Sequence, residues 1–230
     1  MDSLPDSEPN KLLVFWVVWL IWKSRNEFLF FLKEMFIILK TLGERWILIL
    51  NGTRMYPRQR IEVQENRSSK WERPPSEWVK CNFDYSPGTD STGVGIAWLL
   101  RDEKGRFLGA GCARVDKTQS SLEGEAISFL FALLQVWIRG WRRVWFEGDN
   151  QELCTLINKV KNHVELGNWL CDVRYWMTVL PESSLDNANR EKNQAADALA
   201  KQAVHQSNLF IFFDIPPVWL IQFLYIPYTI

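Results

Sequence analysis

Four acidic side chains of this sequence have the type and the placement needed for metal-assisted chemistry. They follow predicted strands or lie on predicted helices, and they are Asp84, Glu125, Asp149 and Asp197. Several carboxylates within a few ångströms repel one another strongly unless a cation neutralises them. Because carboxylate oxygens are hard ligands that select Mg²⁺ or Mn²⁺, the sequence predicts a divalent metal site if the elements carrying these acids are neighbours.

Such a site is suited to phosphodiester chemistry. Two ions about 3.5 to 4 Å apart form a clamp, in which one activates a water molecule and the other stabilises the leaving oxygen. This reaction needs no protein nucleophile, and the sequence contains no Ser/His/Asp or Cys/His arrangement.

Each acid also has a structural explanation when it is taken alone. Asp84 could form the turn at a strand end, and Asp149 could cap the helix that follows it. Glu125 and Asp197 could lie on solvated helix faces. The order of all four within one domain favours an acidic site over these separate explanations.

The elements that must position the acids begin with three strands joined by short turns. Strands are expected over residues 77–84, 94–101 and 106–114, which makes an antiparallel meander. Alternation in the first of them places Lys80 and Asp84 on one face, as in a half-buried strand.

Helices and two further strands follow the meander. Apolar residues recur at three and four over residues 119–139, 150–160, 166–180 and 192–204. A short buried strand is expected over residues 143–149, and residues 182–189 would have to supply another, although they are polar. This order indicates a mixed sheet covered by helices.

The remaining segments flank a domain that we place at residues 76–206. Residues 1–50 are interpreted as an apolar helical region, residues 51–75 as a polar linker, and residues 207–230 as an apolar tail that straps the domain. The wholly apolar run at residues 12–22 is shorter than the about 18 to 20 residues of a membrane span, so a buried or interfacial helix is expected instead.

Charge and cysteine content restrict the partners and the compartment. The 27 basic and 27 acidic residues balance, so any surface for nucleic acid must be local. Trp137, Trp141 and Trp145 beside arginines are one candidate, although a solvated helix end explains those arginines equally well. The four widely spaced cysteines are expected to be reduced core thiols. The first ten residues lack the basic start of a signal peptide, so an intracellular protein, nuclear or cytoplasmic, is expected.

Five stretches, in this order, resemble the ribonuclease H domain of plant non-LTR retrotransposons and their domesticated relatives. They are KCNFD at residues 80–84, GVGIAWLLRD at 93–102 followed by Gly105, Glu125-Ala126, EGDN at 147–150, and REKNQAADALAK at 190–201. The resemblance covers about residues 76–206. Residues 19–26 (WLIWKSRN) also look like the segment that precedes this domain in the same elements.

The resemblance implies an α/β, ribonuclease H-like fold, with a five-stranded mixed sheet whose first three strands are antiparallel. It implies Mg²⁺-dependent hydrolysis of the RNA strand of RNA/DNA hybrids, with two Mg²⁺ or Mn²⁺ ions. The residues that match the metal-binding acids of the family are Asp84, Glu125, Asp149 and Asp197. Glu123 is the rival of Glu125, but the Glu125-Ala126 pair occupies the matching place.

Two residues depart from the pattern of the family. The family usually has Gly after its first acid, and here Tyr85 would crowd the approach of a sugar-phosphate backbone. Many active members have His ten residues before the last acid, and here Asn187 cannot carry a proton near neutral pH. These departures keep a second interpretation open: a retroelement-derived fold with weakened or no catalysis, which only binds nucleic acid or a protein partner.

Overall fold

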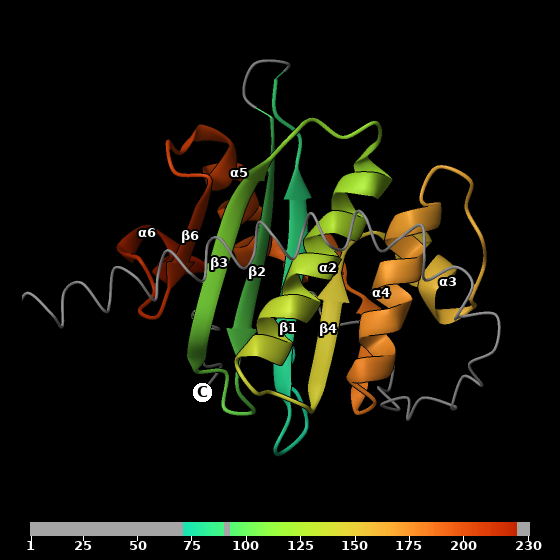
Figure 1. Cartoon of the computed structure of the whole chain (residues 1–230). Helices are drawn as coiled ribbons and strands as arrows, with labels where there is room; N and C mark the ends of the chain where they lie inside the picture. The colour runs from blue at the N-terminus through green and yellow to red at the C-terminus, as the bar shows by residue number, and fades with distance from the viewer. Residues whose placement is uncertain (1–70, 90–92, 225–230) are drawn as a thin grey trace, which may run out of the picture. The chain divides into compact units, whose positions relative to one another are not determined.

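The computed structural model describes residues 71–89 and 93–224, which form a mixed sheet with helices on both faces (Figure 1). The strands are β1 (Val79–Ser86), β2 (Val94–Arg101), β3 (Phe107–Val115), β4 (Val144–Gly148), β5 (Ser183–Asn187) and β6 (Phe210–Phe213). They lie in the order β5-β4-β1-β2-β3-β6. The antiparallel pairing of β1, β2 and β3 and the parallel pairing of β1 with β4 and of β4 with β5 confirm the expected mixed sheet.

The sheet has six strands rather than the expected five, because the tail contributes one. β6 pairs antiparallel with β3, from Ala110 opposite Phe213 to Ala113 opposite Phe210. The short helix α6 (Val218–Leu224) follows, and its Leu220 is buried in the same apolar cluster as α5. The tail therefore extends the sheet at its β3 edge.

The two faces of the sheet are covered by different helices (Figure 1). α2 (Ser121–Ile138) lies across one face, where Phe129 stacks on Phe83 with ring centroids 4.8 Å apart. α4 (Gly167–Val179) packs beside it, and α3 (Gln151–Asn158) lies between β4 and α4 in the sequence. α5 (Gln194–His205) covers the other face, where its small residues approach closely: Ala195, Ala200 and Ala203 pack against Ala97, Leu99 and Cys112.

Within residues 71–89 and 93–224, one helix is long and apolar enough to cross a membrane by length and composition. That helix is α2, and 72% of the relevant window is buried inside the protein. The apolar run at residues 12–22 lies outside the described residues. Cys81, Cys112 and Cys154 are buried free thiols, as expected, whereas Cys171 is only half-buried.

The polar face of β1 is buried, so the expectation of a half-buried strand is wrong. Lys80 and Asn82 are both 0% exposed. The Lys80 ammonium lies 2.7 Å from a carboxylate oxygen of Glu147 and 3.7 Å from the centre of the Trp145 ring. Burial lowers the pKa of Lys80 to about 8, although Glu147 opposes this shift. An ion pair inside the protein thus connects β1 with β4.

Trp71, which falls in the expected linker, covers this ion pair. Its indole Nε1 donates to Asn82 Oδ1 at 2.9 Å, and its ring centre lies 3.7 Å from the guanidinium carbon of Arg101. Asn82 also donates to Glu147 at 3.3 Å, across the register pair that joins β1 to β4. These contacts hold β1 and β4 together just before Asp84 and Asp149.

Tyr85 is accommodated by a glycine on α2. A Cβ added at Gly124 would reach 2.7 Å from Tyr85 Cγ and would overlap the rest of the ring. The Tyr85 hydroxyl lies 3.5 Å from the Thr118 hydroxyl, before the helix starts. The ring is therefore half-buried against the first turn of α2, which helps to position that turn.

We predict that Glu147→Gln lowers the free energy of unfolding by about 3 kcal/mol, because it leaves the Lys80 ammonium buried without its carboxylate. Adding Lys80→Met removes that unpaired charge, so the double variant should lose less than the sum of the two single losses. Urea unfolding of all four proteins measures the coupling, and additive losses would contradict the buried pair.

We also predict that Gly124→Ala is destabilising, by about 1 to 3 kcal/mol, since the added methyl overpacks against Tyr85. In an ordinary helix the same change is stabilising by about 1 kcal/mol. In a Tyr85→Ala background the sign should therefore reverse. Equal effects of Gly124→Ala in both backgrounds, measured by urea unfolding, would rule this contact out.

Candidate metal centre

The parallel pairing of β1 and β4 brings two of the predicted acids together at the carboxyl-terminal ends of these strands, and we call this end of the strands the edge that carries the acids. Asp84 lies two residues before the end of β1, and Asp149 directly follows β4. The helix α3 is capped by Asn150, whose side chain accepts from the Leu153 N–H at 2.9 Å. The explanation of Asp149 as a helix cap is therefore wrong, because Asn150 caps this helix.

Glu125 reaches the same edge from the start of α2. The helix is held there by Ser128, whose hydroxyl lies 2.7 Å from the carbonyl oxygen of Asp84 and 3.1 Å from that of Ala97. On the other face Asn193, which precedes α5, donates to the carbonyl oxygen of Phe83 at 2.9 Å. Both helices are thus bonded to the β1 main chain at or beside the acid.

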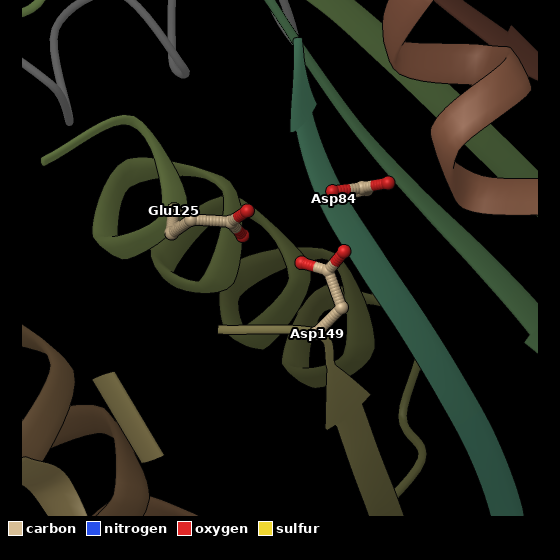
Figure 2. Close-up of side chains that lie close together, drawn as sticks. All are labelled: Asp84, Glu125 and Asp149. Carbon is tan, nitrogen blue, oxygen red and sulfur yellow. The ribbon is translucent and has the colours of Figure 1, made fainter. Parts of the chain in front are cut away.

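Figure 2 shows the carboxylates of Asp84, Glu125 and Asp149 pointing toward one another from β1, α2 and the end of β4. One ligand oxygen from each lies within 4.8 Å of the other two. Asp84 and Glu125 are buried, at 4% and 5% exposed. We call these three residues the acidic cluster.

Burial and mutual repulsion perturb the carboxyl groups of the acidic cluster. Burial, and next the charge of Asp149, raise the pKa of Asp84 to about 8. Burial, and next the charge of Asp84, raise the pKa of Glu125 well above its usual value. In addition, Glu125 Oε2 is buried without a hydrogen-bond partner. Three hard carboxylate oxygen donors that lie this close together fit Mg²⁺ or Mn²⁺.

Asp197, the fourth predicted acid, is not part of this cluster. It lies in the first turn of α5, where its side chain is 41% exposed and 2.6 Å from the Lys201 ammonium. It is close enough to Asp84 for its charge to raise the pKa of that residue further. Its role as a metal ligand stays a prediction.

The other residues singled out in the sequence are distributed around the cluster. Glu123 accepts from the backbone N–H of Gln119 at 2.6 Å and from Trp169 Nε1 at 3.1 Å, so it serves the start of α2. Asn187 is exposed at the end of β5, and its register partner is Gly148, next to Asp149. Asn187, which stands where many active members of the family have a histidine, therefore lies beside the acidic cluster.

The candidate aromatic surface for nucleic acid is formed only in part, because Trp137 and Trp141 are half-buried, with the Arg142 guanidinium 5.9 Å from the Trp137 ring centre, whereas Trp145 is not accessible. Trp145 is buried, at 3% exposed, and Trp137 packs on Trp176. Arg143 pairs with Glu77 and Glu182. Since Trp145 lies near the start of β4, this region is at the edge of the sheet opposite to the acidic cluster.

Arg190 is a site residue that the sequence reasoning missed. Its Nε donates to Asp149 Oδ2 at 3.2 Å. The sequence signal was its place at the start of the REKNQAADALAK stretch, but nothing in that stretch indicates which acid it contacts. Ser128 and Asn193 were missed for the same reason, because their partners are main-chain groups distant in sequence.

Comparison with solved structures returns the ribonuclease H fold. Ribonuclease H1 of the halophilic archaeon Halobacterium salinarum NRC-1 is 19% identical with a TM-score of 0.51, over 55% of this chain and 97% of the archaeal chain. LC11-RNase H1, isolated from compost, is 21% identical with a TM-score of 0.51, over 56% of this chain and 96% of that chain.

A retroviral protein shares the fold as well. The protease-reverse transcriptase of prototype foamy virus is 14% identical with a TM-score of 0.51, over 67% of this chain and 23% of the viral chain. At these identities the likeness shows the fold alone. No curated protein matches the chain.

The sequence itself identifies the family. Residues 82–203, more than half of the chain, match the family described as reverse transcriptase-like. The matched segment includes Asp84, Glu125, Asp149 and Asp197. The resemblance to a ribonuclease H-like domain of retroelement type is confirmed, and the chain belongs to the reverse transcriptase-like family.

Proposed function

We propose that this chain is an endonuclease of ribonuclease H type, which hydrolyses the RNA strand of RNA/DNA hybrids with Mg²⁺ or Mn²⁺. The observation that carries the proposal is the acidic cluster of Asp84, Glu125 and Asp149. LC11-RNase H1, which shares the fold at 20% identity and a TM-score of 0.50, was solved in complex with an RNA/DNA hybrid. That complex supports a hybrid as the substrate to test first.

In this proposal the carboxylates of the acidic cluster bind the metal. A divalent cation bound by these carboxylates supplies the charge that activates water and stabilises the leaving oxygen of a phosphodiester. Asp84 is buried on β1, which pairs with β4, the strand that ends before Asp149, and packs against α2, the helix that carries Glu125. Asp197, at the start of α5, is the candidate for a further ligand.

Asn187 and Tyr85 affect the expected rate of hydrolysis. Asn187 can orient a water molecule but cannot accept a proton near neutral pH, so proton removal must rely on the carboxylates. The Tyr85 ring packs against Gly124, and this contact limits how far the ring can move toward a substrate. Because Asn187 cannot take part in proton transfer, we propose a slow nuclease.

The first test is hybrid cleavage by the full chain in Mg²⁺ or Mn²⁺. Asp84→Asn and Asp149→Asn should each lower the rate by at least about 100-fold, because a bound metal supplies several kcal/mol of transition-state stabilisation. Glu123→Gln is the matched control, since it removes a neighbouring acid outside the cluster, and it should keep most of the activity.

The alternative function predicts another result in the same assay. A fold that only binds nucleic acid or protein would show no metal-dependent cleavage by the unsubstituted chain, and its hybrid binding would not change with Mg²⁺ or with loss of the acids. Metal-dependent cleavage that is lost in Asp84→Asn would exclude this alternative.

The second test is the pH dependence of stability. A carboxyl whose pKa is raised on folding binds its proton more tightly in the folded state, so its contribution to stability is lost as pH rises. For Asp84 the loss should extend from about pH 4, the unfolded value, to about pH 8. Without metal, the melting temperature should therefore fall over this window.

Mg²⁺ should oppose this loss because it binds the deprotonated carboxylates. Its stabilising shift of the melting temperature should be larger at about pH 8.5 than at about pH 6, following the linkage between protons and metal. Asp84→Asn should reduce both the pH dependence and the Mg²⁺ shift. An Mg²⁺ shift that is independent of pH would contradict binding at this cluster.

A further inference from the structure

We propose that Arg190 is a phosphate-binding residue at the solvent side of the acidic cluster. It would contact a phosphodiester of the nucleic acid while the acids hold the metal. This inference rests on the proposed function, and it names a substrate contact that the resemblance to the family does not supply.

The backbone of Arg190 is fixed beside the acidic cluster. Arg190 starts the single 3₁₀ turn Arg190–Lys192 that leads from β5 to α5. Upstream, the Ala188 N–H donates to the Gly148 carbonyl oxygen at 2.8 Å, which attaches this connection to the end of β4. Downstream, the Asn193 N–H closes the turn on the Arg190 carbonyl oxygen at 3.0 Å. Arg190 is therefore positioned by main-chain bonds, not by its own side chain.

The side chain of Arg190 is exposed, although its partner is not. It is 92% exposed, whereas Asp149 is 13% exposed, and their one ion pair joins Nε to Oδ2 at 3.2 Å. A guanidinium has five N–H donors in a planar fork that matches a phosphate. The ion pair with Asp149 uses Nε, so the two terminal NH₂ groups of Arg190 can contact a phosphate while this pair is kept.

Two other cations of this region, Lys201 and Lys192, have different partners. Lys201 pairs with Asp197 at 2.6 Å, and Lys192 pairs with Glu72 at 2.7 Å, while the Lys192 side chain is mostly buried. Among the residues that the structure describes, Arg190 is the arginine whose ion pair is with a member of the acidic cluster. A phosphate that approaches the three carboxylates thus meets positive charge at Arg190.

A simpler role must be distinguished from this one. Arg190 could serve only as a counter-charge for Asp149, in which case it would affect metal affinity but not nucleic-acid binding. The two roles differ in salt dependence, because each phosphate contact releases a counterion and adds about 1 to the slope of log affinity against log salt.

The experiment measures binding of an RNA/DNA hybrid by fluorescence anisotropy at several salt concentrations. It uses the full chain in an Asp84→Asn background with Mg²⁺, so that slow cleavage does not interfere. Arg190→Gln should weaken binding about tenfold and lower the salt slope by about 1. Arg190→Lys should keep the slope and recover part of the affinity, since it keeps the charge but loses the fork.

Arg106→Gln is the matched control. Arg106 is also an exposed arginine paired with a single carboxylate, that of Asp102 at 2.6 Å. It lies in the turn that joins β2 to β3, and the pairing of Arg101 with Lys80 puts that turn at the opposite edge of the sheet. Its removal should leave both affinity and slope unchanged.

Two outcomes would overturn the inference. If Arg190→Gln leaves affinity and slope as in the parent, Arg190 is only a counter-charge, and the proposed nuclease activity is unaffected. If the parent does not bind the hybrid at all, the substrate and the Arg190 contact are both rejected. Cleavage by the unsubstituted chain is scored separately, so failure of Arg190 and failure of the function can be told apart.

Discussion

The parallel pairing of β1 with β4 is the constraint on which the rest of the site depends. It places Asp84 and Asp149 at one edge, and the bond between Asn82 and Glu147 holds the two strands together just before that edge. The Lys80–Glu147 ion pair secures the same strands further from the edge. Because buried charged groups are costly unless they are paired, this interior polar layer tolerates little change in register.

The acidic cluster lowers the stability of the folded protein, whereas the polar layer of Lys80, Asn82 and Glu147 raises it. Three carboxylates within 4.8 Å, two of them buried, are unfavourable in the deprotonated state, and Glu125 Oε2 has no hydrogen-bond partner. The bonds from Ser128 and Asn193 to the main chain of β1 hold the cluster together despite this repulsion. Electrostatic repulsion of this kind between buried carboxylates is typical of a functional site.

The sequence predicted the regular elements because their patterns are local. The strand at residues 94–101 was predicted with the bounds that it has, and β5 was found in the polar stretch where the fold required it. The sequence did not predict which segments pack over which face of the sheet. Alternation showed that Lys80 and Asn82 share a face, but not that Trp71, in a polar segment, covers that face.

The site was predictable in its members and less so in its geometry. Three of the four acids meet, whereas Asp197 pairs with Lys201, a contact between side chains one turn apart that could equally have been read as a surface ion pair. The expectation that Tyr85 crowds the approach of a substrate stays a prediction, and its ring packs against Gly124. Such a contact joins residues that are distant in sequence, and one sequence alone does not reveal it.

The most direct test of this account is a crystal structure of the chain grown or soaked with Mn²⁺, whose anomalous scattering locates the ion without reference to activity. The account predicts an anomalous peak bound by Asp84, Glu125 and Asp149, with metal–oxygen distances of about 2 Å. An acidic cluster that stays free of Mn²⁺ in such a crystal, with its carboxylates protonated or paired to other side chains, would contradict the metal centre.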